Sequence, residues 1–501
     1  MPQRKPNLLF LFSDQHAQRV SGCYGDAVVR TPSLDRLASQ GVTFDNCYCP
    51  SPVCVPSRMA ALTACHPHRQ ECWTNDDYLA SDRPTWLHAL GAAGYRSQLI
   101  GRMHSMGPDQ LHGYSQRLIG DHSPNWSGVK RHSMGVLENA NDPTPESLRA
   151  CGAGRSAYEL KDEQVTVATI DALQEIAATP EESREAFSLT VGLMLPHAPY
   201  VASRDWVEYY LDTLPDVAMD APPDAAEHPW IHWWRHNRGI DQTSLQQIRL
   251  ARAAYWGLVS TMDEMIGRIL QTLSDTGLDR NTLIVYASDH GDHLGERGLW
   301  WKHTFFDESV KVPLIMSMPG TLPAGERQSA VVNLTDLSQT MVDALGAAPL
   351  PQADGNSFWP LLTGASEQWD NRTFSEYCTD AVPAWTGGMA VQQRMMRDGD
   401  FKLHYYHGYP PLLFDLAADP DERVNLADRP EQQQRLTAMQ KTLLADWKPD
   451  DIARTMRQRR QRKDILGRWA AVTEPGNTHL WPVKPEMNLL QENQPASRRE
   501  P

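Results

Sequence analysis

Cys54 stands in a short stretch whose residue types can build a reactive anion site. Pro56 has the fixed φ that suits the first turn of a helix, and residues 59–62 continue as good helix formers. We therefore expect Cys54 at a helix N-terminus, where free N–H groups favour negative charge, with Arg58 one turn on and able to point back. A lone cysteine is more often a small buried residue, so the interpretation depends on this surrounding pattern.

Two apolar runs, 7–12 and 281–287, have the character of buried parallel strands. Ligands of open α/β sheets bind beyond the carboxyl ends of strands, so the polar residues that follow these runs are candidate ligands. They are Asp14, Gln15, Asp289 and His290. Carboxylate, amide and imidazole groups suit a divalent cation. Taken alone, an aspartate after a strand is as often a cap or a turn residue.

Two further runs of this kind lead to histidines. The run 96–100 is followed by Arg102 and His104, which strand alternation places on one side. A guanidinium beside an imidazole suits sulfate binding and proton transfer, and a surface loop with an ordinary histidine is the competing interpretation. The run 187–193 leads to His197, whose flanking prolines fix its loop, and a purely conformational turn is the alternative there.

The stretch Cys54-Val-Pro-Ser-Arg58, followed by Leu62-Thr63, resembles the signature of the formylglycine-dependent sulfatases, a family of the alkaline-phosphatase superfamily. In that family a maturation enzyme oxidises the cysteine to an aldehyde, and the hydrate of this aldehyde is the nucleophile. Family members usually continue Leu-Thr-Gly-Arg, whereas this chain has Ala64 and Cys65. The run GRMHSMGPDQLHGY at 101–114 resembles the choline-sulfatase-like branch, and the run 288–316 resembles the second metal motif of the family.

The resemblance implies a role for each candidate. The implied metal ligands are Asp14, Gln15, Cys54, Asp289 and His290, around one divalent cation that we expect to be Ca²⁺, with Mn²⁺ or Mg²⁺ as alternatives. The implied catalytic residues are Cys54, Arg58, His104, His197 and Lys302, and the implied substrate contacts are Arg102 and Asn75. His197 would assist the leaving alcohol, and His104 would take a proton from the hydrate. Gln15 stands where the family usually has a second aspartate, and Arg102 stands where it usually has lysine.

The implied fold is α/β. It comprises an alkaline-phosphatase-like large domain, whose mixed, mostly parallel sheet is flanked by helices, and a smaller C-terminal α+β subdomain with a short antiparallel sheet. A length of 501 residues agrees with one large and one smaller domain. We expect the catalytic domain at 1–370, the subdomain at 371–470, and an arm at 471–501 that lies on the body or on a neighbour.

Alternating runs predict the strands of the subdomain. They lie at 373–377, 389–394, 401–405 and 412–415, and a helix is expected at about 431–447. The basic run 454–468 is interpreted as a solvated helix or a subunit contact.

Composition limits the partners. With 47 Lys and Arg against 62 Asp and Glu, the net charge of −15 argues against a nucleic-acid partner. No apolar run reaches transmembrane length, and the run 8–12 is too short for a signal peptide. The eight cysteines lack zinc spacing and are expected to be reduced. We therefore expect a cytoplasmic homo-oligomer without membrane partners.

The expected function is hydrolysis of a small-molecule sulfate ester through a formylglycine made from Cys54. The first alternative is a phosphonate monoester hydrolase or phosphodiesterase with the same nucleophile. The second is a non-catalytic relative in which Cys54 stays a thiol. The alcohol part of the substrate, the preference between sulfate and phosphonate, and the metal are left open.

Overall fold

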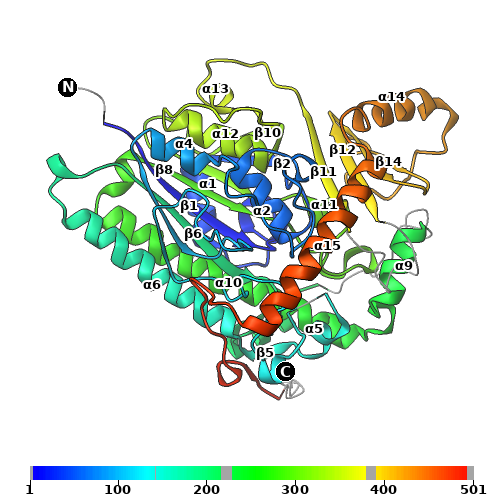
Figure 1. The fold of residues 1–501 in the computed structure, drawn as a ribbon, viewed down its shortest axis with the longest axis horizontal. Helices are drawn as coiled ribbons and strands as arrows, with labels where there is room; N and C mark the ends of the chain where they lie inside the picture. Colours follow the sequence, from blue (N-terminus) through cyan, green and yellow to red (C-terminus); the bar gives the residue numbers. More distant parts are fainter. Residues whose placement is uncertain (1–3, 142, 216–227, 380–390, 493–501) are drawn as a thin grey trace, which may run out of the picture.

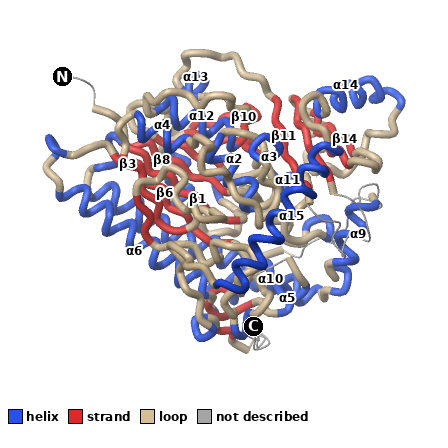
Figure 2. The backbone as a smooth tube through the Cα atoms, in the orientation of Figure 1, coloured by secondary structure: helices blue, strands red, loops and turns tan. Residues whose placement is uncertain are grey.

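The centre of the molecule is a mixed eight-stranded sheet (Figures 1 and 2). The computed structural model describes residues 4–141, 143–215, 228–379 and 391–492. The strand order is β10-β2-β9-β8-β1-β6-β3-β4. The strands are β1 Asn7–Asp14, β2 Val42–Tyr48, β3 Arg96–Gly101, β4 Gln116–Leu118, β6 Phe187–Pro196, β8 Thr282–Ser288, β9 Leu314–Ser317 and β10 Glu326–Asn333. Only β9 runs antiparallel to its neighbours among these described strands, so the expected mixed, mostly parallel sheet is confirmed.

The middle strand, β1, lies between β6 and β8 and is parallel to both. Every residue of these three strands is buried, as expected for continuous apolar runs covered on both faces. Ser13 pairs in register with Ser288, and Asp14 pairs with Pro196. The carboxyl ends of three core strands therefore meet at one place.

Helices cover both faces of this sheet (Figure 1). One face carries α1 Pro32–Ser39, α6 Ala157–Ala178 and α10 Leu245–Asp275, with α7 Arg204–Thr213 packed on α10, and the other carries α2 Cys54–Thr63, α4 Trp86–Ala92 and α12 Leu334–Ala344. Further helices are α3 Pro67–Gln70, α5 Pro145–Arg149, α9 Pro229–Asn237, α11 Asp307–Val310 and α13 Trp359–Leu362. Within the described residues, none of the helices has both the length and the apolar character that crossing a membrane requires.

A second, antiparallel sheet follows the large domain in the order β11-β12-β13-β14. Its strands are β11 Arg372–Cys378, β12 Gln392–Asp398, β13 Phe401–Tyr406 and β14 Leu412–Asp415, and α14 Gln433–Leu443 packs on it. The separate antiparallel sheet confirms the expected architecture. The predicted division at residues 370 and 470 stays a prediction.

Two boundaries predicted for the subdomain were wrong. The strand expected at 389–394 is β12, which runs from Gln392 to Asp398, because Gly399 at φ 58° makes the tight turn into β13. Residues 389 and 390 lie outside the described part of the chain. The helix expected at 431–447 is shorter: α14 ends at Leu443, and the next helix opens with Pro449 at its first position.

That next helix, α15 Pro449–Thr473, carries the basic run and returns from the second sheet across the large domain (Figure 1). Arg459 and Lys463 pair there with Glu71 and Asp77, at 2.9 and 3.1 Å. The chain then lies on the body of the molecule, where β15 Leu489–Leu490 joins β5 Gly152–Arg155 and β7 Val201–Ala202 in a small sheet. All eight cysteines are in the described residues and are free thiols.

Candidate active site

The strand-end residues converge as the parallel register requires. Asp14 is the last residue of β1, while Asp289 and His290 follow β8 directly. Cys54 is the first residue of α2, so the expected helix N-terminus is present. Ligand atoms of these four residues lie within 4.8 Å of one another, and all four side chains are buried. We call this set the metal cluster.

The chemistry of the metal cluster fits a divalent cation. His290 Nδ1 lies 3.1 Å from the carbonyl of Gly291, which leaves Nε2 facing the cluster. That Nε2 atom lies 3.2 Å from Cys54 Sγ, and Asp14 Oδ1 lies 3.7 Å from the same sulfur. Two carboxylates and one imidazole nitrogen around a small buried space are a donor set for hard and borderline cations.

Gln15 lies beside the metal cluster with both ends of its amide engaged. Its Oε1 accepts a hydrogen bond from Lys302 Nζ at 2.8 Å, and its Nε2 donates to Asp292 Oδ2 at 2.6 Å. Tyr200 donates to the same Asp292 oxygen at 2.6 Å. The carbonyl oxygen of Gln15 is therefore held against Lys302 Nζ, which itself contacts Cys54 and His290 of the cluster.

Arg58 holds the two carboxylates of the metal cluster side by side. Its Nε donates to Asp289 Oδ2 at 2.8 Å and its Nη2 donates to Asp14 Oδ2 at 3.1 Å, all in a fully buried environment. Burial and the Cys54 sulfur raise the pKa of Asp14, but the guanidinium groups of Arg102 and Arg58 outweigh them and lower it. The structure thus places Arg58 against the two carboxylates of the metal cluster, and its catalytic role stays a prediction.

Lys302 reaches the same centre from the loop after β8. Its Nζ lies 3.0 Å from Cys54 Sγ, 3.0 Å from His290 Nε2 and 3.4 Å from His197 Nε2. Burial raises the pKa of the Cys54 thiol, but the nearby charges of Lys302 and His290 lower it well below its usual value. A negative charge at position 54 is therefore favoured.

Arg102 and His104 meet, but the alternation argument for their placement was wrong. β3 ends at Gly101, and His104 has a φ of 58°, so neither residue follows strand geometry. They meet because Arg102 Nη2 donates to His104 Nδ1 at 2.7 Å. Arg102 also donates from Nε to Asp14 Oδ2 at 2.5 Å, which ties this pair to the metal cluster.

A cavity of about 230 Å³ opens over Cys54, and we call it the substrate cavity. Six predicted site residues line it: Cys54, Asn75, Arg102, His104, His197 and Lys302. The Oδ1 atom of Asn75 also accepts a hydrogen bond from Val55 N at 3.0 Å, which satisfies a free N–H at the start of α2. The other predicted site residues are not part of this described lining and lie beneath it: Arg58, Asp14, Gln15, Asp289 and His290.

Sequence reasoning missed four residues around the substrate cavity. Asp121 accepts hydrogen bonds from Arg102 Nη1 at 2.9 Å and from His104 N at 2.8 Å. Tyr158, His122 and His303 line the cavity, and Tyr158 Oη lies 3.0 Å from His122 Nε2. The available signals were the polar stretch that starts at Asp121 and the position of His303 directly after Lys302.

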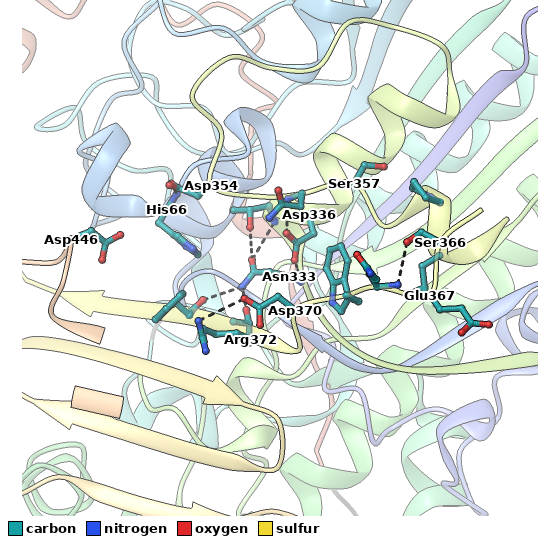
Figure 3. A pocket seen from close by; sticks show the side chains of 18 of the residues that line it. His66, Asn333, Asp336, Asp354, Ser357, Ser366, Glu367, Asp370, Arg372 and Asp446 are labelled. Atoms are coloured by element: carbon teal, nitrogen blue, oxygen red, sulfur yellow. Dashed lines mark hydrogen bonds and ion pairs between the residues drawn. The ribbon is translucent and has the colours of Figure 1, made fainter. Parts of the chain in front are cut away.

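A second, larger cavity of about 930 Å³ lies between the start of α12 and β11, where Figure 3 shows His66, Asn333 and Asp336. It is at the far end of α2, because the N–H groups of Asp354 and Gly355 bond the carbonyl of Ala64 there. A ten-residue helix is about 15 Å long. The described lining of this cavity contains none of the predicted site residues, whereas six of them line the substrate cavity.

Comparison with known protein families gives two matches. Residues 6–347 match the family described as Sulfatase, and residues 295–448 match the family described as N-sulphoglucosamine sulphohydrolase, C-terminal. The chain belongs to the sulfatase family. It is a sulfatase-family hydrolase with a buried Asp/Cys/Asp/His candidate metal site.

Individual relatives support the same family. The sulfatase chain is 32% identical over 491 residues to a choline-sulfatase of Rhizobium meliloti (strain 1021), covering 93% of this chain and 91% of that protein. Its fold resembles the phosphonate monoester hydrolase of Agrobacterium radiobacter with a TM-score of 0.72, at 23% identity over 88% of this chain and 95% of that one. It also resembles a protein solved with its substrate D-glucosamine-2-N,6-O-disulfate, with a TM-score of 0.71, at 22% identity over 89% and 99%. The expected membership and the alkaline-phosphatase-like fold are both confirmed.

Proposed function

We propose that the protein hydrolyses sulfate esters of small alcohols, using a formylglycine made from Cys54 and one divalent cation, with Ca²⁺ the first candidate. The observation that carries this proposal is the convergence of Cys54, Lys302 and the carboxylates of the metal cluster at the floor of one cavity. The partner it requires is a maturation enzyme that oxidises Cys54. Cytoplasmic placement and homo-oligomeric assembly belong to the same proposal.

A divalent cation would polarise the sulfate oxygens, and the residues that would hold it are Asp14, Gln15, Asp289 and His290. A formylglycine at position 54 would supply the nucleophile, because its hydrate can attack sulfur. Arg58 keeps the two carboxylates together under that site. Lys302 and Arg102 line the substrate cavity as cations, and they would stabilise charge on the sulfuryl oxygens.

The two histidines would handle protons. His197 Nδ1 lies 2.7 Å from the carbonyl of Ala198, so Nε2 is the atom available to the leaving alcohol. His104 receives a hydrogen bond from Arg102 at Nδ1, and the neutral ring then carries its proton on Nε2. For His104 to accept a proton at Nε2, Arg102 must first release Nδ1 and the ring proton must move from Nε2 to Nδ1.

The alcohol part of the substrate is proposed from one relative and from the lining of the cavity. Similarity to a choline-sulfatase supports choline sulfate as the first natural ester to test. Within the described lining, Tyr158 offers an aromatic ring and Glu138 offers a carboxylate, which are the groups that hold an ammonium ion. Similarity to a protein bound to a sulfated glucosamine supports sugar sulfates as the second class to test.

Phosphonate monoester hydrolysis is the competing function, because an amide and an imidazole, Gln15 and His290, complete the ligand set. The fold similarity to phosphonate monoester hydrolases agrees with it. The deciding experiment compares kcat/KM for an aryl sulfate and the matching aryl phosphonate monoester, in protein co-expressed with a maturation enzyme. Cys54→Ala is the blank, and Cys23→Ala, at a half-buried thiol, is the matched control. A higher kcat/KM for the aryl sulfate, with activity lost in Cys54→Ala, supports the proposal. A higher kcat/KM for the aryl phosphonate overturns it.

A further inference from the structure

The last described part of the chain lies directly against the substrate cavity. We call residues 477–483 the terminal segment. Its backbone pairs with Asp121: Asp121 N donates to the carbonyl of His479 at 3.0 Å, and Trp481 N donates to the carbonyl of Asp121 at 2.6 Å. Figure 1 shows this end of the chain arriving from α15 and passing by α6 and β5. More than four hundred residues separate it from Cys54 in sequence.

Side chains add to this contact at Asn125, four residues after Asp121. Asn477 Oδ1 accepts a hydrogen bond from the backbone N–H of Asn125 at 2.8 Å. Asn125 Nδ2 in turn donates to Thr478 Oγ1 at 3.1 Å. The loop 121–125 is thus held at both ends by the terminal segment, and it has no helix or long strand of its own to fix its shape.

This loop carries the carboxylate that orders two site residues. Asp121 is buried, and it binds Arg102 at Nη1 and His104 at its backbone N–H, at 2.9 and 2.8 Å. It touches neither the substrate cavity nor the metal cluster in the described contacts, so it acts through its neighbours. The terminal segment is therefore connected to Arg102 and His104 through Asp121.

The terminal segment also supplies part of the cavity wall. Val483 lines the substrate cavity together with Cys54, and it is only 4% exposed. The wall is anchored beside it, because Trp481 Nε1 donates to Gln164 Oε1 on α6 at 2.9 Å. Further along, Asn488 Oδ1 accepts a hydrogen bond from Ala157 N at the start of α6, at 2.7 Å. A wall held at several points can restrict the size of a leaving group.

We propose that the terminal segment is a working part of the active site. In this proposal, which rests on the proposed ester hydrolysis, Asp121 is a positioning residue that the segment holds in place for Arg102 and His104. Val483 is a specificity-determining residue that limits the size of the alcohol. None of the motifs around the strand ends or Cys54 includes these positions.

The wall is tested by changing the volume of Val483 and measuring kcat/KM for phenyl sulfate and for the bulkier naphthyl sulfate. Because the substrate cavity is small, Val483→Phe should lower the naphthyl-to-phenyl ratio about tenfold, and Val483→Ala should raise it. Val472→Phe is the matched control, since Val472 lies near the end of α15 and is 83% exposed. If the naphthyl-to-phenyl ratio of kcat/KM is the same in Val483→Phe as in Val472→Phe, Val483 does not limit the size of the alcohol.

The positioning role is tested at Asn477, whose side chain bonds the loop. Asn477→Ala removes the acceptor for Asn125 N and should lower kcat for phenyl sulfate about tenfold with little change in KM. Asn477→Asp keeps an acceptor oxygen and should restore kcat. A purely structural role would lower the melting temperature without changing kcat well below it, and that result would contradict the proposal.

A measurement without substrate separates this inference from the proposed function. In protein made without a maturation enzyme, Cys54 remains a thiol, and its alkylation by iodoacetamide and by the larger N-phenylmaleimide can be followed by mass spectrometry. Val483→Phe should slow the larger reagent selectively, and Val483→Ala should speed it. If the wild type cleaves neither sulfates nor phosphonates but these labelling rates change, only the proposed function fails. If esters are cleaved and neither ratio nor labelling changes, only the present inference fails.

Discussion

The ammonium of Lys302 lies 3.0 Å from the sulfur of Cys54, although the two residues are 248 positions apart in the chain. Both side chains are buried, and the lysine arrives from a strand-end loop while the cysteine opens a helix. A buried cation at this distance favours whichever form of residue 54 is negative. The contact therefore predicts that Lys302 matters for any anionic nucleophile or transition state formed there.

Replacing Lys302 with Met should lower kcat/KM for an aryl sulfate about 100-fold or more, because a buried cation directed at developing charge is lost. Lys311→Met is the matched control. Lys311 lies nine residues later, is 23% exposed and pairs with Asp307 at 3.5 Å near the surface. Steady-state kinetics on both variants check this. A kcat/KM for Lys302→Met within about threefold of the control would contradict a role of Lys302 in the reaction.

Asp289→Asn should lose most of the bound metal while keeping the fold. The change preserves the shape of a side chain whose Oδ1 accepts a hydrogen bond from Gln15 N at 3.0 Å, but it removes a charge from the metal cluster. Elemental analysis of purified protein measures the bound ion directly, independently of activity.

The control for that variant is Asp263→Asn on α10. Asp263 is equally buried and also accepts backbone hydrogen bonds, from Ser33 and Leu34 at 2.9 and 2.8 Å, but it belongs to no metal cluster. Its metal content should match the wild type. Equal metal loss in both variants would mean that destabilisation, and not ligand removal, explains the result.

The parts of this site that sequence could predict are those that follow from parallel strands. Asp14 and Asp289 each come directly after a buried apolar run, and parallel strands bring their carboxyl ends to one edge. Cys54 was placed at a helix start because Pro56 marks the first turn. These are local rules that act over a few residues.

The remaining parts depend on contacts that no local rule describes. Arg102 and His104 meet through a hydrogen bond beyond the end of β3, where strand alternation no longer holds. Asp121 lies in an irregular loop whose shape depends on backbone pairing with residue 479, near the end of the described chain. Such pairings arise from tertiary packing, so single-sequence patterns do not reveal them.

The ion pair between His68 and Glu376 should make stability depend on pH. Burial lowers the pKa of His68, but the Glu376 carboxylate, 2.6 Å from Nδ1, raises it, and the result lies above the ordinary value of 6.5. A folded pKa above the unfolded one stabilises the protein fully below about pH 6.5, and this stabilisation is lost as pH rises through the folded pKa. The free-energy difference between wild type and His68→Gln should therefore be largest below about pH 6.5 and shrink as the pH rises above it.

Urea unfolding at several pH values measures this difference. His236→Gln is the control, because the ring of His236 is 65% exposed and lies 3.2 Å from Asp241 at the surface. Exposed pairs contribute little, so that variant should follow the wild type at every pH. A pH-independent difference for His68→Gln would show that lost packing, and not the charge of the pair, causes the destabilisation.

Glu422 should be one of the strongest single attachments between the second sheet and the loop after Lys302. Its buried carboxylate lies 2.9 Å from Lys402 Nζ and accepts a hydrogen bond from Asp307 N, at the start of α11, at 2.8 Å. Removing Glu422 leaves the Asp307 N–H without its acceptor and takes one of two carboxylates from Lys402 Nζ, which still pairs with Asp307 Oδ1 at 2.5 Å. Glu422→Ala should therefore cost about 2 kcal/mol of unfolding free energy.

The loss should be smaller for Glu422→Gln, whose amide oxygen can still accept the bond from Asp307 N, and negligible for the exposed control Glu431→Ala. Since α11 begins five residues after Lys302, Glu422→Ala should also lower kcat/KM, and it should do so more than its effect on the folded fraction explains. Urea titration and kinetics on the same samples test both statements. Activity that falls only in proportion to the unfolded fraction would confine Glu422 to stability, because the loop with Lys302 would then hold its position unaided.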